Sequence, residues 1–421
     1  MDPASIAPLL EPAGWALLAE LPPYDASSSL ALGTALRASG LDADLVAAAL
    51  TQSRLRAKAR AKFGDLARDM LFTPEGLEQA TRLPVAARHA HRFRTAGATY
   101  VADLGCGIGA DAMALAGMEL RVLAVERDPA TALVAGINLR ALPEARVWQG
   151  DAFDADLTGV DAVWADPARR TTSGARLHRL ADYSPAVERL LALRMSGPHP
   201  VGMLGLKLSP ALAHRDIPVD ARAEWVSVGG DVVETGLWFG DLAPEGPGRT
   251  ALLLAVDGVH VLAERGDPSA PVTPAPTGPL GAYLYEPDGS VLRAGVVHRV
   301  AEETGTHLID PSIAFLTGDH LRPTPWATAF RVLDAMPFSL KRLRAYLRER
   351  DVGTLEIKKR GSALDPARLR GQLSLRGRAS ATIVLTRVAG EQRVLVVERV
   401  GDRPEPLERP DIRPDDERGD A

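Results

Sequence analysis

Cysteine is nearly absent from this 421-residue sequence, which contains only Cys106. A single cysteine excludes intrachain disulfides and metal sites built from clusters of cysteines. The nine histidines are scattered, and the closest set, His89 and His91, lacks the i, i+4 helical spacing that would direct two ligands toward one metal ion. We therefore expect no metal site.

Long hydrophobic runs are also missing. No stretch of about 18 apolar residues occurs, so we expect no membrane-spanning helix. The first residues, MDPASIAPLLEP, lack the basic and then apolar layout of a signal peptide. Because 46% of the residues are hydrophobic and 24% are charged, the composition is typical of a soluble globular protein, and we predict a cytoplasmic location.

The formal net charge of −5 is distributed unevenly along the chain. Residues 51–94 contain ten Lys or Arg against four Asp or Glu, a local balance of +6. Residues 326–400 contain sixteen against seven, a balance of +9. Such basic segments favour an anionic partner over a neutral one. Residues 401–421 are rich in charge and proline and poor in apolar residues, which predicts disorder.

The hydrophobic pattern changes along the chain, which is long enough for two or three domains. Apolar residues at helical spacing predict helices up to about residue 94. Alternating strands and helices then predict a parallel sheet covered on both faces, and later runs separated only by turns predict antiparallel hairpins. The expected strands are 100–104, 121–126, 145–148, 160–165 and 201–206, followed by 223–228, 232–239, 251–256 and 259–263. The proline-rich residues 266–281 predict a stiff linker or an exposed crossing loop before a compact α+β module.

Three glycines follow the first predicted strand, in DLGCGIGAD (103–111). Gly105, Gly107 and Gly109 leave room for a ligand against the backbone at the carboxyl edge of the sheet. A dinucleotide-binding fold has the same order of strand, glycines and helix, so this loop alone does not identify the ligand.

Acidic residues at the ends of the next three predicted strands indicate which ligand the glycine loop binds. Glu126 lies where a carboxylate can bind both ribose hydroxyls, and Asp151 lies where an adenine amino group can be bound. The fourth strand ends in Asp166-Pro167. Each acid could instead cap a helix. The full order, D-x-G-x-G-x-G, E, D and D-P, matches class I S-adenosylmethionine (SAM) methyltransferases.

Five segments, spread over roughly residues 40–400, resemble one family of predicted class I methyltransferases that carry a C-terminal THUMP-like domain. They are KFGDLARDMLFTPEGLEQATR (62–82), DLGCGIGADA (103–112), DPARR (166–170), GDVVETGLWFG (230–240) and GTLEIKKRG (353–361). The resemblance implies an α/β fold, with a Rossmann-like class I methyltransferase sheet, an N-terminal helical domain and a C-terminal α+β THUMP-like domain. Because THUMP domains bind RNA, it also implies a tRNA or rRNA substrate.

Together, the resemblance and the changes in composition predict five regions. They are an N-terminal helical domain (1–95), a SAM-dependent methyltransferase domain (96–265), a Pro-rich linker and connecting segment (266–325), a basic THUMP-like domain (326–400) and a disordered tail (401–421). The oligomeric state is not predicted by these patterns.

The resemblance also implies the SAM-binding residues. They are Thr73, Asp103, Gly105, Gly107, Gly109, Asp111, Glu126, Arg127, Asp151, Ala152 and Asp166. Thr73 belongs to a segment similar to the one that contacts the methionine end of SAM in amino-methyltransferases. From the residues alone, Thr73 is a helix N-cap with Pro74 at the first helical position, and both roles can hold together.

The loop after the fourth strand, DPARRT, suggests how a nucleophile is aligned. Methyl transfer is an in-line displacement, so the protein must align a lone pair with the methyl group. Enzymes that methylate exocyclic amines use an (N/D)-P-P-(Y/F) loop, in which the acid or amide and the proline carbonyl accept hydrogen bonds from the amine. Asp166 and Pro167 match this loop, whereas Arg169 replaces the aromatic residue and could stack on a base or bind phosphate.

Two other methylation reactions require residues that can be sought in this sequence. Pyrimidine C5 methylation needs a cysteine nucleophile, and the only candidate, Cys106, lies inside the glycine loop. Ribose 2′-O-methylation with a Lys-Asp-Lys-Glu tetrad would use Asp166, Lys207 and Glu234 as catalytic residues. We favour a structural Lys207–Glu234 pair, because the first lysine of the tetrad has no clear counterpart.

Two basic segments are candidates for RNA contact. Arg169, Arg170 and Arg176 follow the D-P pair and could bind phosphates beside the cofactor. Lys358, Lys359 and Arg360 could form a second RNA-binding surface. A small-molecule or protein methyltransferase, and a non-catalytic SAM- or RNA-binding factor, remain the alternatives.

Overall fold

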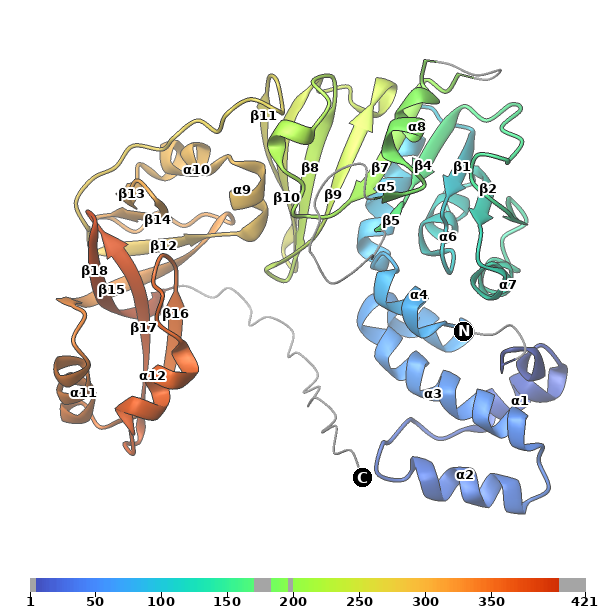
Figure 1. Cartoon of the computed structure of the whole chain (residues 1–421), viewed down its shortest axis with the longest axis horizontal. Helices are drawn as coiled ribbons and strands as arrows, with labels where there is room; N and C mark the ends of the chain where they lie inside the picture. Colours follow the sequence, from blue (N-terminus) through green and yellow to red (C-terminus); the bar gives the residue numbers. More distant parts are fainter. Residues whose placement is uncertain (1–4, 170–182, 196–199, 401–421) are drawn as a thin grey trace. The chain divides into compact units, whose positions relative to one another are not determined.

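The computed structural model describes residues 5–169, 183–195 and 200–400 (Figure 1). The chain divides into two compact units. The first contains the chain up to Asp216 together with residues 220–222 and 236–246. The second contains residues 217–219, 223–235 and the chain from Pro247 onward.

Helices form the start of the first unit. They are η2 (Ala7–Leu9), α1 (Pro12–Glu20), α2 (Ser29–Ala38), α3 (Ala43–Phe63), η3 (Gly64–Asp69), α4 (Pro74–Gln79) and α5 (Leu83–Thr95). The longest helix, α3, begins after Asp42, whose carboxylate accepts two backbone N–H bonds, and ends at Gly64, whose φ of 57° favours glycine. Buried side chains of α3, including Leu55 and Phe63, share one hydrophobic core with Ile108 of the glycine loop. The helices are therefore packed onto the domain that follows them.

A nine-stranded sheet has the order β11-β10-β8-β9-β7-β4-β1-β2-β3. Its strands are β1 (Tyr100–Leu104), β2 (Arg121–Glu126), β3 (Ala145–Gln149), β4 (Ala162–Ala165), β7 (Met203–Leu208), β8 (Arg222–Val228), β9 (Asp231–Phe239), β10 (Gly248–Ala255) and β11 (Gly258–Arg265). The strands from β7 through β4, β1 and β2 to β3 are parallel, and β10 pairs with β11 in antiparallel fashion. The predicted α/β sheet with a terminal hairpin is therefore confirmed.

The helices of this region are α6 (Ala110–Ala116), α7 (Pro129–Asn138) and α8 (Val187–Ala192). Two tryptophans lie at the centre of the sheet core. The rings of Trp164 and Trp238 are stacked, with centroids 5.1 Å apart. A Cβ on Gly205 of β7 would lie 2.7 Å from the Trp164 ring and 2.8 Å from the Trp238 ring. Glycine at this position therefore makes room for the two indoles.

The second unit contains a seven-stranded sheet with the order β13-β14-β12-β15-β18-β17-β16. Its elements are β12 (Tyr283–Pro287), α9 (Gly289–Ala294), α10 (Val297–Thr304), β13 (His307–Asp310), β14 (Ile313–Gly318), β15 (Ala327–Pro337), α11 (Leu340–Glu349), β16 (Val352–Lys359), α12 (Pro366–Leu373), β17 (Ala379–Val388) and β18 (Glu391–Val400). Three of these strands come from 266–325, the range expected to be a linker and connecting segment. None of the helices in the described ranges is long and apolar enough to span a membrane.

Candidate functional site

The glycine loop joins β1 to α6. Gly105, Gly107 and Gly109 have φ values of 88°, 56° and 87°, a region of backbone conformation that favours glycine. A Cβ on Gly107 would meet no atom within 4 Å, so space is open beside this residue. A Cβ on Gly105 would lie 3.1 Å from the carbonyl oxygen of Asp166, because the loops after β1 and β4 approach each other closely.

The carboxylate of Glu126, at the end of β2, lies beside this loop. Its Oε2 accepts a hydrogen bond from the Gly107 backbone N–H at 3.1 Å, and its Oε1 accepts one from Asp128 at 2.8 Å. Glu126, the residue expected to bind the ribose of SAM, is thereby held against the glycine loop. Arg127 and Asp151 are exposed, and Ala152 is half-buried. Asp151 accepts a hydrogen bond from the backbone N–H of Phe153 at 3.0 Å.

Asp103 is a buried acid at the end of β1, with an exposed fraction of 1%. Its Oδ2 has no hydrogen-bond partner among the described residues. Burial raises the pKa of Asp103 well above its usual range, and the negative charges of Asp111 and Asp166 raise it further. A cationic group would relieve this unfavourable burial. The orphaned carboxylate oxygen and the open space at Gly107 therefore fit a cofactor that carries a sulfonium and an amino group, as SAM does.

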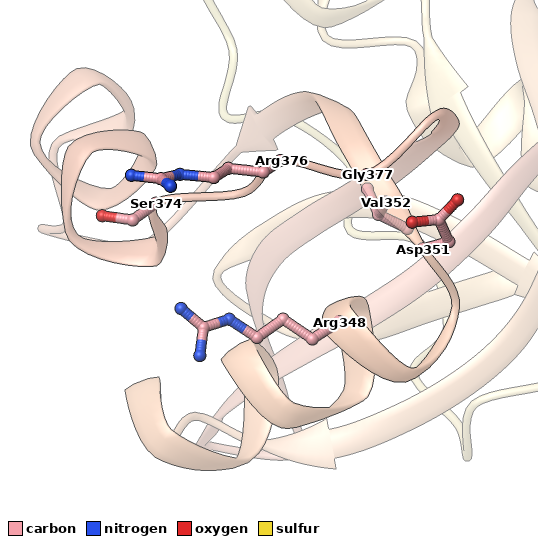
Figure 2. Close-up of a pocket in the computed structure, with 6 residues that line it drawn as sticks. All are labelled: Arg348, Asp351, Val352, Ser374, Arg376 and Gly377. Atoms are coloured by element: carbon pink, nitrogen blue, oxygen red, sulfur yellow. The ribbon is translucent and has the colours of Figure 1, made fainter.

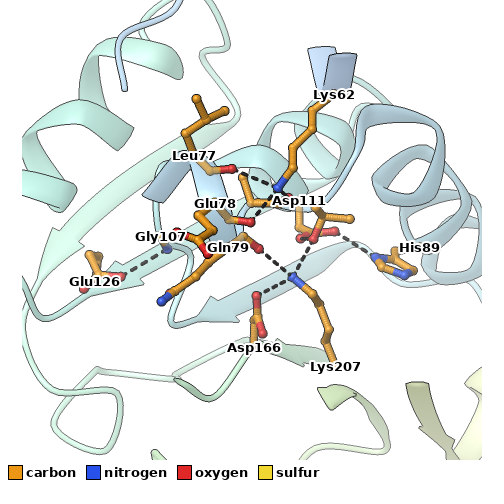
Figure 3. A network of polar contacts seen from close by, with 12 residues as sticks. Lys62, Leu77, Glu78, Gln79, His89, Gly107, Asp111, Glu126, Asp166 and Lys207 are labelled. Atoms are coloured by element: carbon orange, nitrogen blue, oxygen red, sulfur yellow. Dashed lines mark hydrogen bonds and ion pairs between the residues drawn. The ribbon is translucent and has the colours of Figure 1, made fainter. Parts of the chain in front are cut away.

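The most direct contact between predicted catalytic residues is the ion pair between Lys207 and Asp166 (Figure 3). Lys207 Nζ lies 2.6 Å from Asp166 Oδ2, and the Asp166 side chain is 30% exposed. Lys207 also donates to Thr81 Oγ1 at 2.9 Å and to the carbonyl of Gln79 at 3.2 Å. Because β4 and β7 are neighbouring parallel strands, the residues at their carboxyl ends meet at one edge of the sheet.

A chain of buried hydrogen bonds continues from Thr81. Its hydroxyl donates to Asp111 Oδ2 at 2.6 Å, and His89 Nδ1 donates to Asp111 Oδ1 at 2.8 Å. Burial alone would raise the pKa of Asp111, but His89, Lys207 and Thr81 outweigh it and lower the pKa. The ring centroid of His89 lies 4.3 Å from that of Trp164. Asp111, a predicted cofactor residue, thus holds α6 to α5 and to the segment before it.

Helix α4 connects this network with the glycine loop. Thr73 is its N-cap, because its hydroxyl accepts the Gly76 N–H at 2.9 Å, which confirms the capping interpretation. A Cβ on Gly76 would lie 2.4 Å from Ile108, so the helix packs closely on the loop.

Lys62 of α3 binds the other end of α4. Its Nζ donates to the carbonyls of Leu77, Glu78 and Ala80 at 2.7–2.8 Å (Figure 3). Burial and, after it, the charge of Lys207 lower the pKa of Lys62 to about 8.

The other predicted site residues near the sheet are Glu234 and the residues that follow Asp166. Glu234 is buried in β9. Pro167 is buried, and Arg169 lies in β5 (Ala168–Arg169), which pairs with β6 (Tyr183–Ser184). Arg170 and Arg176 lie outside the described residues. Within the described ranges, no group of three His, Cys, Asp or Glu residues is placed to hold a metal ion.

Thr81, His89 and Lys62 were not singled out in the sequence. Thr81 and Lys62 lie in the 62–82 segment that carries the resemblance, which was the available signal. The spacing of His89 and His91 gives no signal for the bond between His89 and Asp111. What joins these residues to Lys207 is the packing of α3 to α5 on the sheet.

Comparison with known proteins finds related families and structures. A family model described as "THUMP domain-like" matches residues 327–399, and a domain of unknown function (DUF8688) matches residues 2–59. Two uncharacterized SAM-dependent methyltransferases, from Mycobacterium tuberculosis strains CDC 1551 and H37Rv, are each 35% identical over 343 residues, which cover 79% of this chain and 90% of theirs. A crystal structure from Porphyromonas gingivalis W83, named as a methyltransferase, has a TM-score of 0.68 at 21% identity and covers 90% of this chain and all of that one.

Proposed function

This chain belongs to the SAM-dependent methyltransferases, and on that premise we propose that it methylates a base nitrogen of RNA, either tRNA or rRNA. The observation that carries the proposal is the position of Asp166, a partly exposed acid that is paired with Lys207, follows β4 and precedes Pro167. The match to THUMP domain-like sequences and the +9 balance of residues 326–400 support an RNA substrate.

When bound, SAM supplies the electrophilic methyl group. Asp103 and Glu126 would hold the cofactor, for the reasons given above. The carboxylate of Asp166 and the carbonyl of Pro167 would accept hydrogen bonds from an exocyclic amine and turn its lone pair toward the methyl group. Lys207, 2.6 Å from Asp166, restricts the orientation of the acid.

Ribose 2′-O-methylation is the second candidate, because it would also use Lys207 and Asp166. In that reaction a neutral lysine has to remove a proton from a hydroxyl. Asp166, Thr81 and Gln79 all accept hydrogen bonds from Lys207 Nζ, as suits an ammonium group that has only donors. An ammonium group held in this way is a poor base, which favours the base nitrogen.

The test is methyl transfer from labelled SAM to total RNA from a strain that lacks the gene, followed by mass spectrometry of the nucleosides. We expect label in one base-methylated nucleoside, and loss of that label with Asp166→Ala. The matched control is Glu144→Ala, which removes an exposed acid outside the site. Label in a metabolite or protein fraction, with none in RNA, would refute the RNA proposal.

A further inference from the structure

The predicted RNA-binding cations of the THUMP-like domain already have protein partners. Lys358 Nζ lies 2.9 Å from a carboxylate oxygen of Glu286, and Lys359 Nζ donates to the carbonyl of Leu364 at 3.2 Å. Arg360 donates to the carbonyl of Ala314 at 3.1 Å, and its guanidinium lies over an aromatic ring. An RNA phosphate would have to compete with these contacts, so other cations of this domain are better placed to bind it.

Two such cations line a cavity of about 380 Å³ (Figure 2). Arg348 lies in the last turn of α11, and Arg376 lies in the segment between α12 and β17. Both side chains are exposed, and neither has a hydrogen bond or an ion pair to any described residue. Figure 2 shows both arginine side chains extending to the same side of the cavity. The hydroxyl of Ser374 lies beside the Arg376 side chain. Guanidinium groups bind phosphate oxygens in a bidentate manner, and unpartnered ones lose no internal contact on binding.

The walls of the cavity are fixed by backbone contacts. A Cβ on Gly377 would lie 1.9 Å from the carbonyl oxygen of Asp351, so only glycine allows the two segments to come so close. Asp351 N–H donates to the Arg348 carbonyl at 3.1 Å, and the Asp351 carbonyl accepts from Ala379 at 2.8 Å. Arg344 of α11 donates to the carbonyl of Gln372, near the end of α12. The two arginines are therefore carried on elements that are tied together.

The lining also contains an acid. Asp351 is exposed, and Figure 2 shows it on the side of the cavity away from the two guanidiniums. Its charge opposes a ligand that is anionic throughout, whereas its oxygens can accept hydrogen bonds from hydroxyl groups. A ribonucleotide unit has both features, a phosphate and a ribose 2′-hydroxyl, and the cavity volume is within the usual range for small-ligand sites, about 300–1,000 Å³.

We propose that this cavity binds a phosphodiester of the RNA strand, with Arg348 and Arg376 on the phosphate and Asp351 on the adjoining ribose hydroxyl. The proposal rests on the proposed function in taking RNA as the substrate. It assigns RNA contact to this cavity rather than to Lys358, Lys359 and Arg360.

The test is fluorescence anisotropy with the full-length protein and a labelled single-stranded RNA of mixed sequence, at several salt concentrations. The double variant Arg348→Gln/Arg376→Gln should bind about tenfold more weakly. Its salt slope should fall by about 0.7 for each arginine. The charge-matched control is Lys341→Gln/Arg399→Gln, which removes two exposed cations outside the cavity lining. This control should keep the wild-type affinity and slope, and thermal unfolding and SAM binding should be unchanged in both variants.

Unlabelled competitors identify the source of the phosphate. RNA should compete best, DNA of the same sequence less well because it lacks the 2′-hydroxyl, and adenosine monophosphate or inorganic phosphate only weakly. If the double variant binds RNA with the wild-type affinity, the inference is overturned. It is also overturned if a mononucleotide binds the wild-type protein as tightly as RNA does and no longer binds the double variant. Methyl transfer is measured separately. If the wild-type protein methylates RNA and the double variant binds RNA normally, only the proposed role of the cavity is refuted. If the double variant loses RNA binding but the wild-type protein transfers no methyl group to RNA, only the proposed function is refuted.

Discussion

The ammonium nitrogen of Lys207 lies 2.6 Å from Oδ2 of Asp166, at the carboxyl ends of two neighbouring parallel strands, β7 and β4. This ion pair connects the acid that follows β4 to the helices before the sheet, because Lys207 also binds Thr81 and Gln79. The orientation of the proposed nucleophile-aligning acid therefore depends on residues far from it in sequence.

Replacing either partner of this pair should separate the two reactions considered above. With Asp166→Ala, we expect kcat to fall at least about 100-fold, because the amine loses the side-chain acceptor that turns its lone pair toward the methyl group. With Lys207→Met, we expect a fall of about tenfold, because Asp166 loses only its positioning partner. The dissociation constant of SAM, measured by calorimetry, should change little in either variant.

The pH dependence of kcat tests whether Lys207 is a positioning residue or a general base. If Lys207→Met lost about 1,000-fold or more in kcat together with the basic limb of the wild-type profile, Lys207 would be a general base. Ribose 2′-O-methylation would then replace base methylation as the preferred reaction.

Thr81 should act as a positioning residue for Lys207. Thr81→Val removes the hydroxyl that accepts from Lys207 and donates to Asp111, and both contacts are partly or fully buried. We expect a loss of about 1–3 kcal/mol in the free energy of unfolding, measured in urea, together with a lower kcat. Thr81→Ser keeps the hydroxyl and should restore most of the rate. A Thr81→Val enzyme with wild-type stability and rate would show that the network does not influence the site.

Glu126 should be needed for cofactor binding. Glu126→Ala removes the carboxylate that holds the Gly107 and Asp128 backbone N–H groups, so the glycine loop loses an anchor, and the ribose would lose its proposed partner. We expect the dissociation constant of SAM to rise at least about tenfold, since hydrogen bonds to a charged group contribute about 1.5–3 kcal/mol each. Glu144→Ala is the control. Equal affinity for SAM in the two variants would contradict the assignment of Glu126.

Lys62 should give folding stability a pH dependence of defined sign. Burial lowers its pKa to about 8 in the folded protein, against 10.5 for an unperturbed lysine. Between these values the unfolded chain binds a proton that the folded chain has released. The free energy of unfolding should therefore rise with pH across this window, by up to about 1.4 kcal/mol per pH unit. Below pH 8 both states bind the proton, so Lys62 causes no rise there.

The comparison of Lys62→Met with Lys58→Met checks this dependence by urea unfolding at several pH values. Lys58 lies on the same helix and is exposed, so its replacement should leave the slope unchanged. Lys62→Met should be less stable at every pH, because the carbonyls of Leu77, Glu78 and Ala80 lose their donor, and it should lack the rise above pH 8. An identical rise in both variants would exclude Lys62 as its source.

Much of the fold and part of the site could be predicted from local patterns. Alternating apolar strands and helices predict a parallel sheet, and in such a sheet the carboxyl ends of the strands lie on one edge. That rule was enough to bring Asp103, Glu126 and Asp166 to one region. The cap at Thr73 was equally predictable, because an N-cap depends on its own residue and the next few.

The sequence by itself determined the class of fold, the cofactor loop and the acids at the strand ends, because these depend on residues close together in the chain. Only the tertiary structure decided which residues support the acids: Thr81 meets Lys207 across 126 positions, through the packing of the N-terminal segment on the sheet. It also decided which cations of the THUMP-like domain have protein partners. Counting charges along the sequence does not distinguish the cations of this domain from one another. The structure shows that Lys358 is paired with Glu286 and that Arg348 and Arg376 line a cavity.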